Sequence, residues 1–390
     1  MAYELGQGTG PLAGIKVVEI AGIGPSPHAC MILADLGADV IRVERPGGQV
    51  LTGGSHDLLN RGRPSVALNL KDPKAVETVL DLVEQADVLV EGMRPGVAER
   101  LGFGPEACEQ RNPRLVFARM TGWGQEGPWA QAAGHDMNYI AITGTLHGLG
   151  QDKSKPQFPA NLVGDFGGGS TYLVIGILAA LLEARVSGKG QVVDAAIVDG
   201  TASLNAMTSA FLAGGGFREE RVSNLLDGGT PYYDVYETAD GEHMSVGALE
   251  PQFYDLLVEL LGIKDQAPDN LERFDPARSA ELRDLLTTTF KTRTRDEWSA
   301  VFDGTDACVA PILKMSEAPE HPHMKAREVF VEHEGIVQPQ PAPRFSRTTP
   351  RLGMPPAAGP GVHTREALTA WGIEDVDGLI SSGAAVQVEG

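Results

Sequence analysis

The chain has 390 residues, of which 42% are hydrophobic and 22% are charged, and its formal net charge at pH 7 is −20. This size and composition are typical of a globular protein with one large and one small core. The acidic balance argues against nucleic acid or an anionic membrane surface as a partner, because both need a basic face. A polyanionic ligand would therefore require a local cluster of arginine and lysine.

The three cysteines, Cys30, Cys108 and Cys308, are odd in number and far apart in the chain. This pattern favours neither a disulfide framework nor a zinc site. The first ten residues lack the basic and apolar regions of a signal peptide, and the longest apolar run, 172–182, is shorter than the roughly 20 residues that span a bilayer. We therefore expect a cytoplasmic protein with no membrane insertion and no bound metal.

In the N-terminal half, short β-branched runs alternate with stretches of helical periodicity, which predicts an α/β fold with a parallel sheet. The predicted strands span 15–20, 40–43, 65–70, 86–90, 115–120 and 191–197. Residues 72–85 place apolar side chains at helical spacing, with Asp72 as N-cap and Pro73 at the first helical position, and this predicts a crossover helix. A long apolar helix is expected over 168–185, packed on the sheet.

The composition changes after residue 213, where glycines interrupt the chain. We expect a large domain over 11–213 that is completed by 334–390, a small domain over 229–327, and linkers at 214–228 and 328–333. The proline-rich and arginine-rich tail over 334–360 suits an extended arm, and a short helix over 364–371 is expected to rejoin the large domain.

A glycine pair near the first strand resembles a dinucleotide-binding loop. Gly22 and Gly24 follow the strand, but Pro27 stands where the third glycine of that fingerprint belongs. We therefore do not expect a nicotinamide cofactor.

Two segments concentrate polar and titratable side chains. Residues 134–139 combine a turn glycine, an imidazole and hydrogen-bonding groups, and residues 161–170 set Asp165 beside a glycine run that opens the apolar helix. Bare glycine amides at a helix N-terminus would stabilise negative charge. By composition alone, Asp165 is equally compatible with a plain N-cap, and His135 with a capping or satisfied core residue.

Several longer segments resemble the family III CoA-transferase superfamily and, within it, the α-methylacyl-CoA racemase branch. These segments are 12–19, 34–40, 60–71, 94–97, 118–128, 134–136 and 247–254, and the likeness runs from about residue 11 to about residue 350. The resemblance implies an interlocked homodimer, in which each chain has a Rossmann-like, CoA-binding large domain and a smaller α+β domain. It also implies an acyl-CoA thioester as substrate, with no cofactor.

The resemblance further implies roles for individual residues. His135 and Asp165 would be the two bases that move an α-proton, and Glu250 would reach His135 from the partner chain. Asn161 would hydrogen-bond a catalytic side chain, and the backbone amide of Asp136 would stabilise the enolate oxygen. The implied substrate and CoA contacts are Arg45, Leu68, Asn69, Leu70, Lys71, Arg94, Gly134, Asp136, Met137, Asn138 and Tyr139.

The chain departs from the commoner family pattern at two of the positions near the nucleotide. Asn69 replaces an aspartate and Met93 replaces an aromatic residue, so the contacts at the nucleotide edge are in doubt.

We therefore expect a 2-methylacyl-CoA racemase that works by two-base proton transfer through an enolate. Two alternatives stay open: a CoA-transferase with Asp165 as nucleophile, and a non-catalytic acyl-CoA-binding protein. The histidine in the 134–136 turn favours the racemase, because transferase members of the superfamily generally lack it.

Overall fold

The computed structural model of the protein describes residues 4–48 and 54–389, which form two compact units. The first unit contains residues up to 143, 159–205 and 326–390, and the second contains 144–158 and 206–325. Compared with the predicted domains, residues 144–158 and the expected linker 214–228 lie in the second unit, and the expected linker 328–333 lies in the first.

The insertion 144–158 belongs to the second unit because a buried arginine holds it there. The guanidinium of Arg221 donates to the carbonyls of His147, Asp152 and Lys153 at 2.6, 2.8 and 2.6 Å. Sequence periodicity carries no signal for such a long-range contact.

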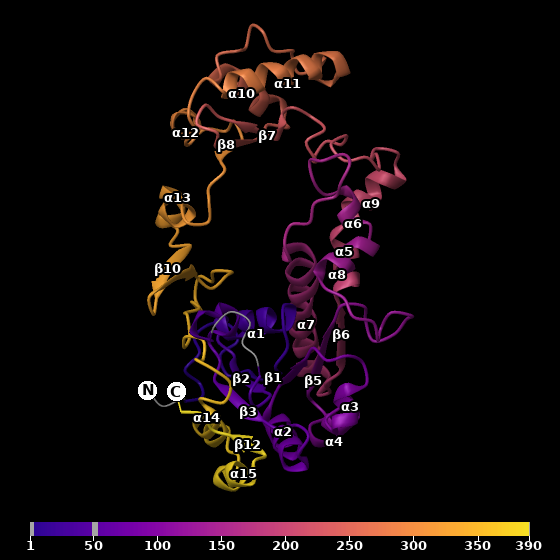
Figure 1. Ribbon diagram of the computed structural model, residues 1–390, viewed down its shortest axis with the longest axis vertical. Helices are drawn as coiled ribbons and strands as arrows, with labels where there is room; N and C mark the ends of the chain where they lie inside the picture. The colour runs from indigo at the N-terminus through magenta and orange to yellow at the C-terminus, as the bar shows by residue number, and fades with distance from the viewer. Residues whose placement is uncertain (1–3, 49–53, 390) are drawn as a thin grey trace. The chain divides into compact units, whose positions relative to one another are not determined.

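The first unit is built on a seven-stranded sheet (Figure 1). In spatial order the strands are β12 (Ala385–Val386), β3 (Ser65–Leu68), β2 (Asp39–Glu44), β1 (Lys16–Ile20), β4 (Val88–Glu91), β5 (Val116–Thr121) and β6 (Val192–Ala196). Strands β1 to β6 pair in parallel and confirm the six predicted strands to within two residues at each end. The additional strand β12 pairs antiparallel with β3.

Helices cover both faces of this sheet, because successive side chains of a strand point to opposite sides. In β1, Val17 packs into the core beneath α1 (Pro25–Asp35) and α7 (Thr171–Ser187), and Val18 packs into the core on the other face. The helices on that other face are α2 (Pro73–Gln85), α3 (Val97–Leu101), α4 (Pro105–Arg111), α14 (Thr364–Ala370) and α15 (Val376–Ser382). Figure 1 shows α14, α15 and β12 together at the α2 side of the sheet.

The two predicted short helices of this unit are confirmed. Helix α2 begins at Pro73, and the Asp72 carboxylate caps it by accepting the N–H of Lys74 at 2.9 Å. Helix α14 corresponds to the predicted helix over 364–371.

The long apolar helix begins six residues earlier than predicted. A π-helical segment, η3 (Leu162–Ser170), runs directly into α7 (Thr171–Ser187). The continuous stretch Leu162–Ser187 is long and apolar enough to cross a membrane by length and composition, a test that buried core helices also pass. Its Leu173 and Ile177 are fully buried against the sheet, which is the environment of a core helix.

The C-terminal arm is only partly extended. Strands β10 (Phe330–His333) and β11 (Ile336–Pro339) form an antiparallel hairpin, so the expectation of an unpaired arm is wrong for residues 334–339. Arg61 anchors the hairpin, because its guanidinium donates to the Gln338 side chain at 2.9 Å and to the Pro339 carbonyl at 3.0 Å. Residues 340–360 contain no helix or strand.

The second unit is a small α+β structure around its own core. Its antiparallel sheet has the order β7 (Tyr233–Glu237), β8 (His243–Gly247) and β9 (Val309–Pro311). Its helices are α6 (Thr145–Gly148), α9 (Ala206–Ala213), α10 (Pro251–Leu260), α11 (Pro276–Phe290) and α12 (Arg295–Phe302), with α13 (Pro322–Ala326) at its border with the first unit.

Candidate active site

The predicted histidine lies at the start of a short helix that follows β5. His135 is the N-cap of α5 (Asp136–Ile142), and its backbone N–H donates to the Asn138 Oδ1 atom at 3.0 Å. His135 is exposed, whereas the side chain of Asn138 is engaged in capping the helix. The imidazole therefore lies at the protein surface, at the N-terminus of α5, which the side chain of Asn138 stabilises.

Asp165 lies in η3, beside the histidine turn. Its backbone N–H donates to the Asp136 Oδ2 atom at 2.6 Å, and its carboxylate accepts the Asn161 side-chain amide at 3.3 Å. The pKa of Asp165 lies above the usual range for an aspartate, mainly because the side chain is partly buried. The negative charge of Asp136 raises this pKa further, whereas the Asn161 hydrogen bond and His135 lower it. The structure therefore brings His135, Asp136, Asn161 and Asp165 into one cluster.

The glycine run after Asp165 does not form an open helix N-terminus, so that expectation is wrong. Gly168 and Gly169 are buried inside a continuous helix. A Cβ atom at Gly168 would lie 2.4 Å from the Thr201 Oγ1 atom of α8 (Ile197–Leu204), and one at Gly169 would lie 3.1 Å from Pro25. These glycines instead let α8 and α1 approach the segment that carries Asp165.

Tyr139 holds the turn that contains His135. Its hydroxyl donates to the Gly134 carbonyl at 2.5 Å, and its ring meets Trp123 edge to face, with the ring centroids 4.7 Å apart. Burial and the charge of Asp165 raise the pKa of Tyr139, and Arg94 lowers it. Arg94 and Asp165 are therefore both close enough to the Tyr139 hydroxyl for their charges to change its pKa.

The predicted nucleotide-binding residues follow the carboxyl ends of three parallel strands, the edge where open α/β sheets bind ligands. Arg45 follows β2, Asn69 and Lys71 follow β3, and Arg94 follows β4. Arg45 and Arg94 are exposed, and neither forms an ion pair within residues 4–48 and 54–389. Both guanidinium groups are therefore available to an anionic ligand.

Three apolar side chains at this edge pack against the sheet core, fully in the case of Leu68 and partly in the case of Leu70 and Met93. Leu68 is 0% exposed and packs in the sheet core, so only its main chain can reach a ligand. Met93, which departs from the family pattern, packs partly buried against the same core. Leu70 is partly buried there as well.

Two further residues that approach η3 were not predicted. A Cβ atom at Gly24 would lie 3.0 Å from the Asp165 Oδ2 atom, and the His28 Nδ1 atom lies 2.6 Å from the Ser170 hydroxyl. Gly24, which belongs to the loop that resembles a dinucleotide-binding loop, thus lies close to the Asp165 carboxylate. Gly24 directly before a proline at the first turn of α1 was a sequence signal for a tight helix entry.

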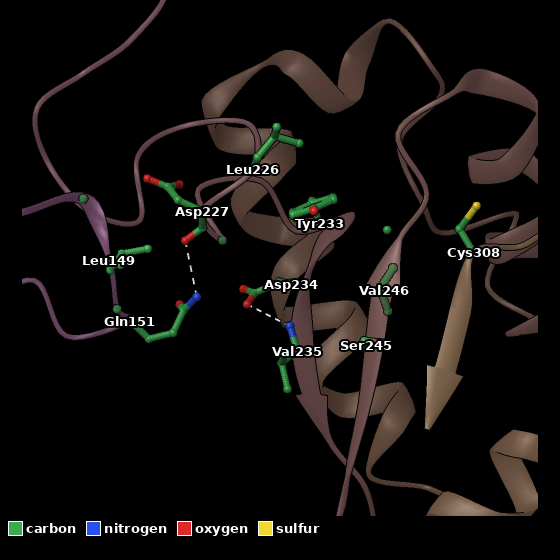
Figure 2. Close-up of a pocket in the computed structure, with 14 residues that line it drawn as sticks. Leu149, Gln151, Leu226, Asp227, Tyr233, Asp234, Val235, Ser245, Val246 and Cys308 are labelled. Atoms are coloured by element: carbon green, nitrogen blue, oxygen red, sulfur yellow. Dashed lines mark hydrogen bonds between the residues drawn. The ribbon is translucent and has the colours of Figure 1, made fainter. Parts of the chain in front are cut away.

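Glu250 lies in the second unit, as the N-cap of α10 and three residues after the end of β8. Burial raises the pKa of the nearby Cys308 thiol, and the negative charges of Glu250 and Asp306 raise it further. The same unit contains a cavity of about 500 Å³. Figure 2 shows Leu226, Tyr233 and Val246 around it, and Cys308 also lines it.

No group of three or more His, Cys, Asp or Glu side chains with metal-binding geometry occurs in the described part of the chain. The cluster supplies one imidazole, from His135, and one partly buried carboxylate, from Asp165, and these two groups suit proton transfer.

The fold and the site together define a Rossmann-like α/β protein with a histidine and a carboxylate clustered at the ligand-binding edge of its sheet. The chain belongs to CoA-transferase family III, whose family model matches residues 12–364. It is 43% identical to the α-methylacyl-CoA racemase of Mus musculus and 42% identical to that of Homo sapiens, with 93% of each chain covered. The crystal structure of a CAIB/BAIF family protein from Brucella suis matches with a TM-score of 0.79 at 27% identity, over 94% of this chain and 100% of that one.

Proposed function

We propose that the protein is an isomerase that interconverts the (2R) and (2S) forms of 2-methylacyl-CoA thioesters. The observation that carries this proposal is the cluster of the His135 imidazole with the Asp165 carboxyl, two groups that can each donate or accept a proton, at the ligand-binding edge of the sheet. The likeness to two α-methylacyl-CoA racemases over most of the chain supports the same activity.

The reaction requires removal of a weakly acidic proton next to the thioester carbonyl and its return on the opposite face. One base takes the α-proton while the C–H electron pair moves into the enolate, and the protonated second base donates to the other face. His135 and Asp165 perform these two steps in one direction and exchange roles in the reverse direction. Asn161 orients Asp165 through its 3.3 Å hydrogen bond.

Charge development on the thioester oxygen needs a hydrogen-bond donor. The backbone amide of Asp136, at the first position of α5, supplies it in our proposal. Arg45, Lys71 and Arg94 bind the phosphates of CoA, and this local positive charge offsets the repulsion expected from the net charge of −20. Proton transfer of this kind needs no redox cofactor.

We further propose that the working form is an interlocked homodimer in which Glu250 of one chain orients His135 of the other. Helix α7 supports an association, because Ile175, Leu182 and Val186 are 54, 65 and 89% exposed, which is unusual for a cluster of large apolar side chains.

All three cysteines are free, which supports a reducing, cytoplasmic location.

A deuterium experiment tests the proposed reaction. Either pure enantiomer of a 2-methylacyl-CoA, incubated in deuterated water with no added metal, nucleotide or acceptor acid, is expected to become a near-equal mixture with deuterium at the α-carbon. Chiral chromatography and NMR measure the two outcomes. Absence of α-deuterium, followed by CoA exchange once a carboxylic acid acceptor is added, would support the Asp165 transferase instead, and binding without either reaction would indicate an acyl-CoA carrier.

Complementation tests the dimer. Glu250→Gln is expected to lower the activity of every site, and refolding it together with the His135→Ala chain is expected to restore part of the activity, because some sites then receive intact residues from both chains. Separately refolded and then mixed chains serve as the control. No recovery after joint refolding would place Glu250 outside the site of the partner chain.

A further inference from the structure

The side chain of Asp136 connects the two segments that carry the candidate bases. Asp136 is 5% exposed and directly follows His135, and its Oδ2 atom accepts the backbone N–H of Asp165 at 2.6 Å. A charged acceptor at this distance forms one of the stronger hydrogen bonds in proteins. The contact fixes the helical turn of η3 that carries Asp165 relative to the turn that carries His135.

This contact is possible because residue 164 is a glycine. A Cβ atom at Gly164 would lie 2.5 Å from the Asp136 Oδ2 atom and 2.8 Å from its Cγ atom. Real Cβ atoms do not approach so closely, so any larger residue would displace the carboxylate. Gly164 is buried, which leaves the two groups no free space in which to separate.

The second oxygen of the same carboxylate has an unusual environment. Within the described ranges, Asp136 Oδ1 is buried and has no hydrogen-bond partner in the protein. Leaving a buried charged oxygen unpaired costs free energy, so packing alone does not explain why a carboxylate occupies this position. An apolar residue of similar size would avoid that cost.

The negative charge also acts on Asp165, because Asp136 raises the pKa of Asp165 and His135 lowers it. Tyr139 of α5 lies in the same environment. The other titratable or charged side chains on the elements packed against η3 are His28, Cys30 and Asp35 of α1, Arg119 of β5, Tyr172, Glu183 and Arg185 of α7, Asp194 of β6 and Asp199 of α8. Among all of these groups, the charges that bear on Asp165 are those of Asp136 and His135.

We propose that the Asp136 side chain is a positioning residue for the racemisation, which holds the Asp165 turn and keeps a second negative charge beside the Asp165 carboxylate. This inference rests on the proposed function. The fixed turn keeps Asp165 aimed at the α-carbon, and the neighbouring charge makes Asp165 a stronger base than an isolated aspartate. The backbone amide and the side chain of Asp136 thus serve the same reaction in different ways.

The test compares two substitutions in the full-length protein. Asp136→Asn keeps the shape and one acceptor for the Asp165 N–H but removes the charge. Gly164→Ala keeps the charge but pushes the carboxylate away. Gly359→Ala is the matched control, because a Cβ atom at Gly359 would meet nothing within 4 Å. Each variant is measured for kcat and KM against pH, and for amide hydrogen exchange at Asp165.

For Asp136→Asn, the acidic limb of the kcat profile is expected to move to lower pH with KM nearly unchanged, because loss of the neighbouring charge lowers the pKa of Asp165. A purely structural role would reduce kcat without moving this limb. For Gly164→Ala, kcat is expected to fall on the order of 100-fold, because a displacement of about 1 Å in a catalytic group has that effect. The Asp165 amide should exchange faster in Gly164→Ala and stay protected in Gly359→Ala.

If the acidic limb of the kcat profile of Asp136→Asn lies at the same pH as in the wild-type protein, the proposed charge effect is overturned. If Asp136→Asn does not fold, normal kcat and normal Asp165 amide protection in Gly164→Ala overturn the positioning role. Either failure is separate from failure of the proposed function, which would appear as absence of α-deuterium in the wild-type protein.

Discussion

The His28 Nδ1 atom lies 2.6 Å from the Ser170 hydroxyl, which ties α1 to the end of the π-helical segment that carries Asp165. The His28 ring also packs on Phe166, with the ring centroids 4.4 Å apart. One histidine from the N-terminal part of the chain therefore contacts both the residue after Asp165 and the last residue of η3.

This contact predicts how stability depends on pH. Burial lowers the pKa of His28 below the ordinary histidine value of 6.5, and the positive charges of Arg61 and Arg63 lower it further. The unfolded chain thus binds a proton more readily than the folded one, so the free energy of unfolding is expected to fall as pH decreases from 6.5 toward the folded-state pKa. Above 6.5 the contribution is fully present.

His28→Asn should flatten this pH dependence, because the Asn side chain can replace the Nδ1 atom but does not titrate. Urea unfolding between pH 5 and pH 8 measures the effect, and His56→Asn, at an exposed histidine, is the control. An equal slope in the wild type and in His28→Asn would show that His28 does not carry the dependence.

Removing either candidate base should abolish racemisation but leave binding. His135→Ala and Asp165→Asn are each expected to lose about 10² to 10⁴-fold in kcat, the usual contribution of a positioned general base, with KM changed little. Exchange of the α-proton with solvent deuterium, measured separately for each enantiomer, should survive for the enantiomer that the remaining base deprotonates. Near-normal racemisation in either variant would contradict the two-base assignment.

Arg45 should contribute to CoA binding and not to the proton transfer. Arg45→Gln is expected to raise KM for the CoA thioester by about 10- to 100-fold, the equivalent of one charge-assisted hydrogen bond of about 1.5–3 kcal/mol. A pantetheine thioester, which lacks the nucleotide, should show no change in KM. Arg351→Gln, at another exposed arginine, is the control, and a matching KM increase there would point to a general charge effect.

Gly122 should be intolerant of any side chain because of Tyr139. A Cβ atom at Gly122 would lie 2.1 Å from the Tyr139 ring, whereas one at Gly22 would have only ordinary contacts at 3.6 Å. Gly122→Ala is therefore expected to destabilise the protein by about 1–3 kcal/mol, the typical cost of overpacking, and to lower kcat by moving the His135 turn. Thermal unfolding compares it with Gly22→Ala, and equal melting temperatures would show that the Tyr139 ring can move at no cost.

Much of the first unit was predictable from local patterns. Runs of β-branched residues identified β1 to β6, and the Asp72-Pro73 pair identified the start of α2, because strand formation and helix capping depend mainly on neighbours in the chain. The resemblance between segments pointed to His135 and Asp165. The resemblance also pointed to Arg45 and Arg94, and the structure places each of them after the carboxyl end of a parallel strand.

Other features were decided only by tertiary packing. The glycine run after Asp165 read as an open anion-binding helix end, but in the structure it lets α8 pack against η3. The Asp136–Asp165 contact joins residues 29 positions apart, and the His28–Ser170 contact joins residues 142 positions apart. Neither contact has a local sequence signature, because each depends on how closely two helices approach, and that distance is set by the volume of every side chain between them.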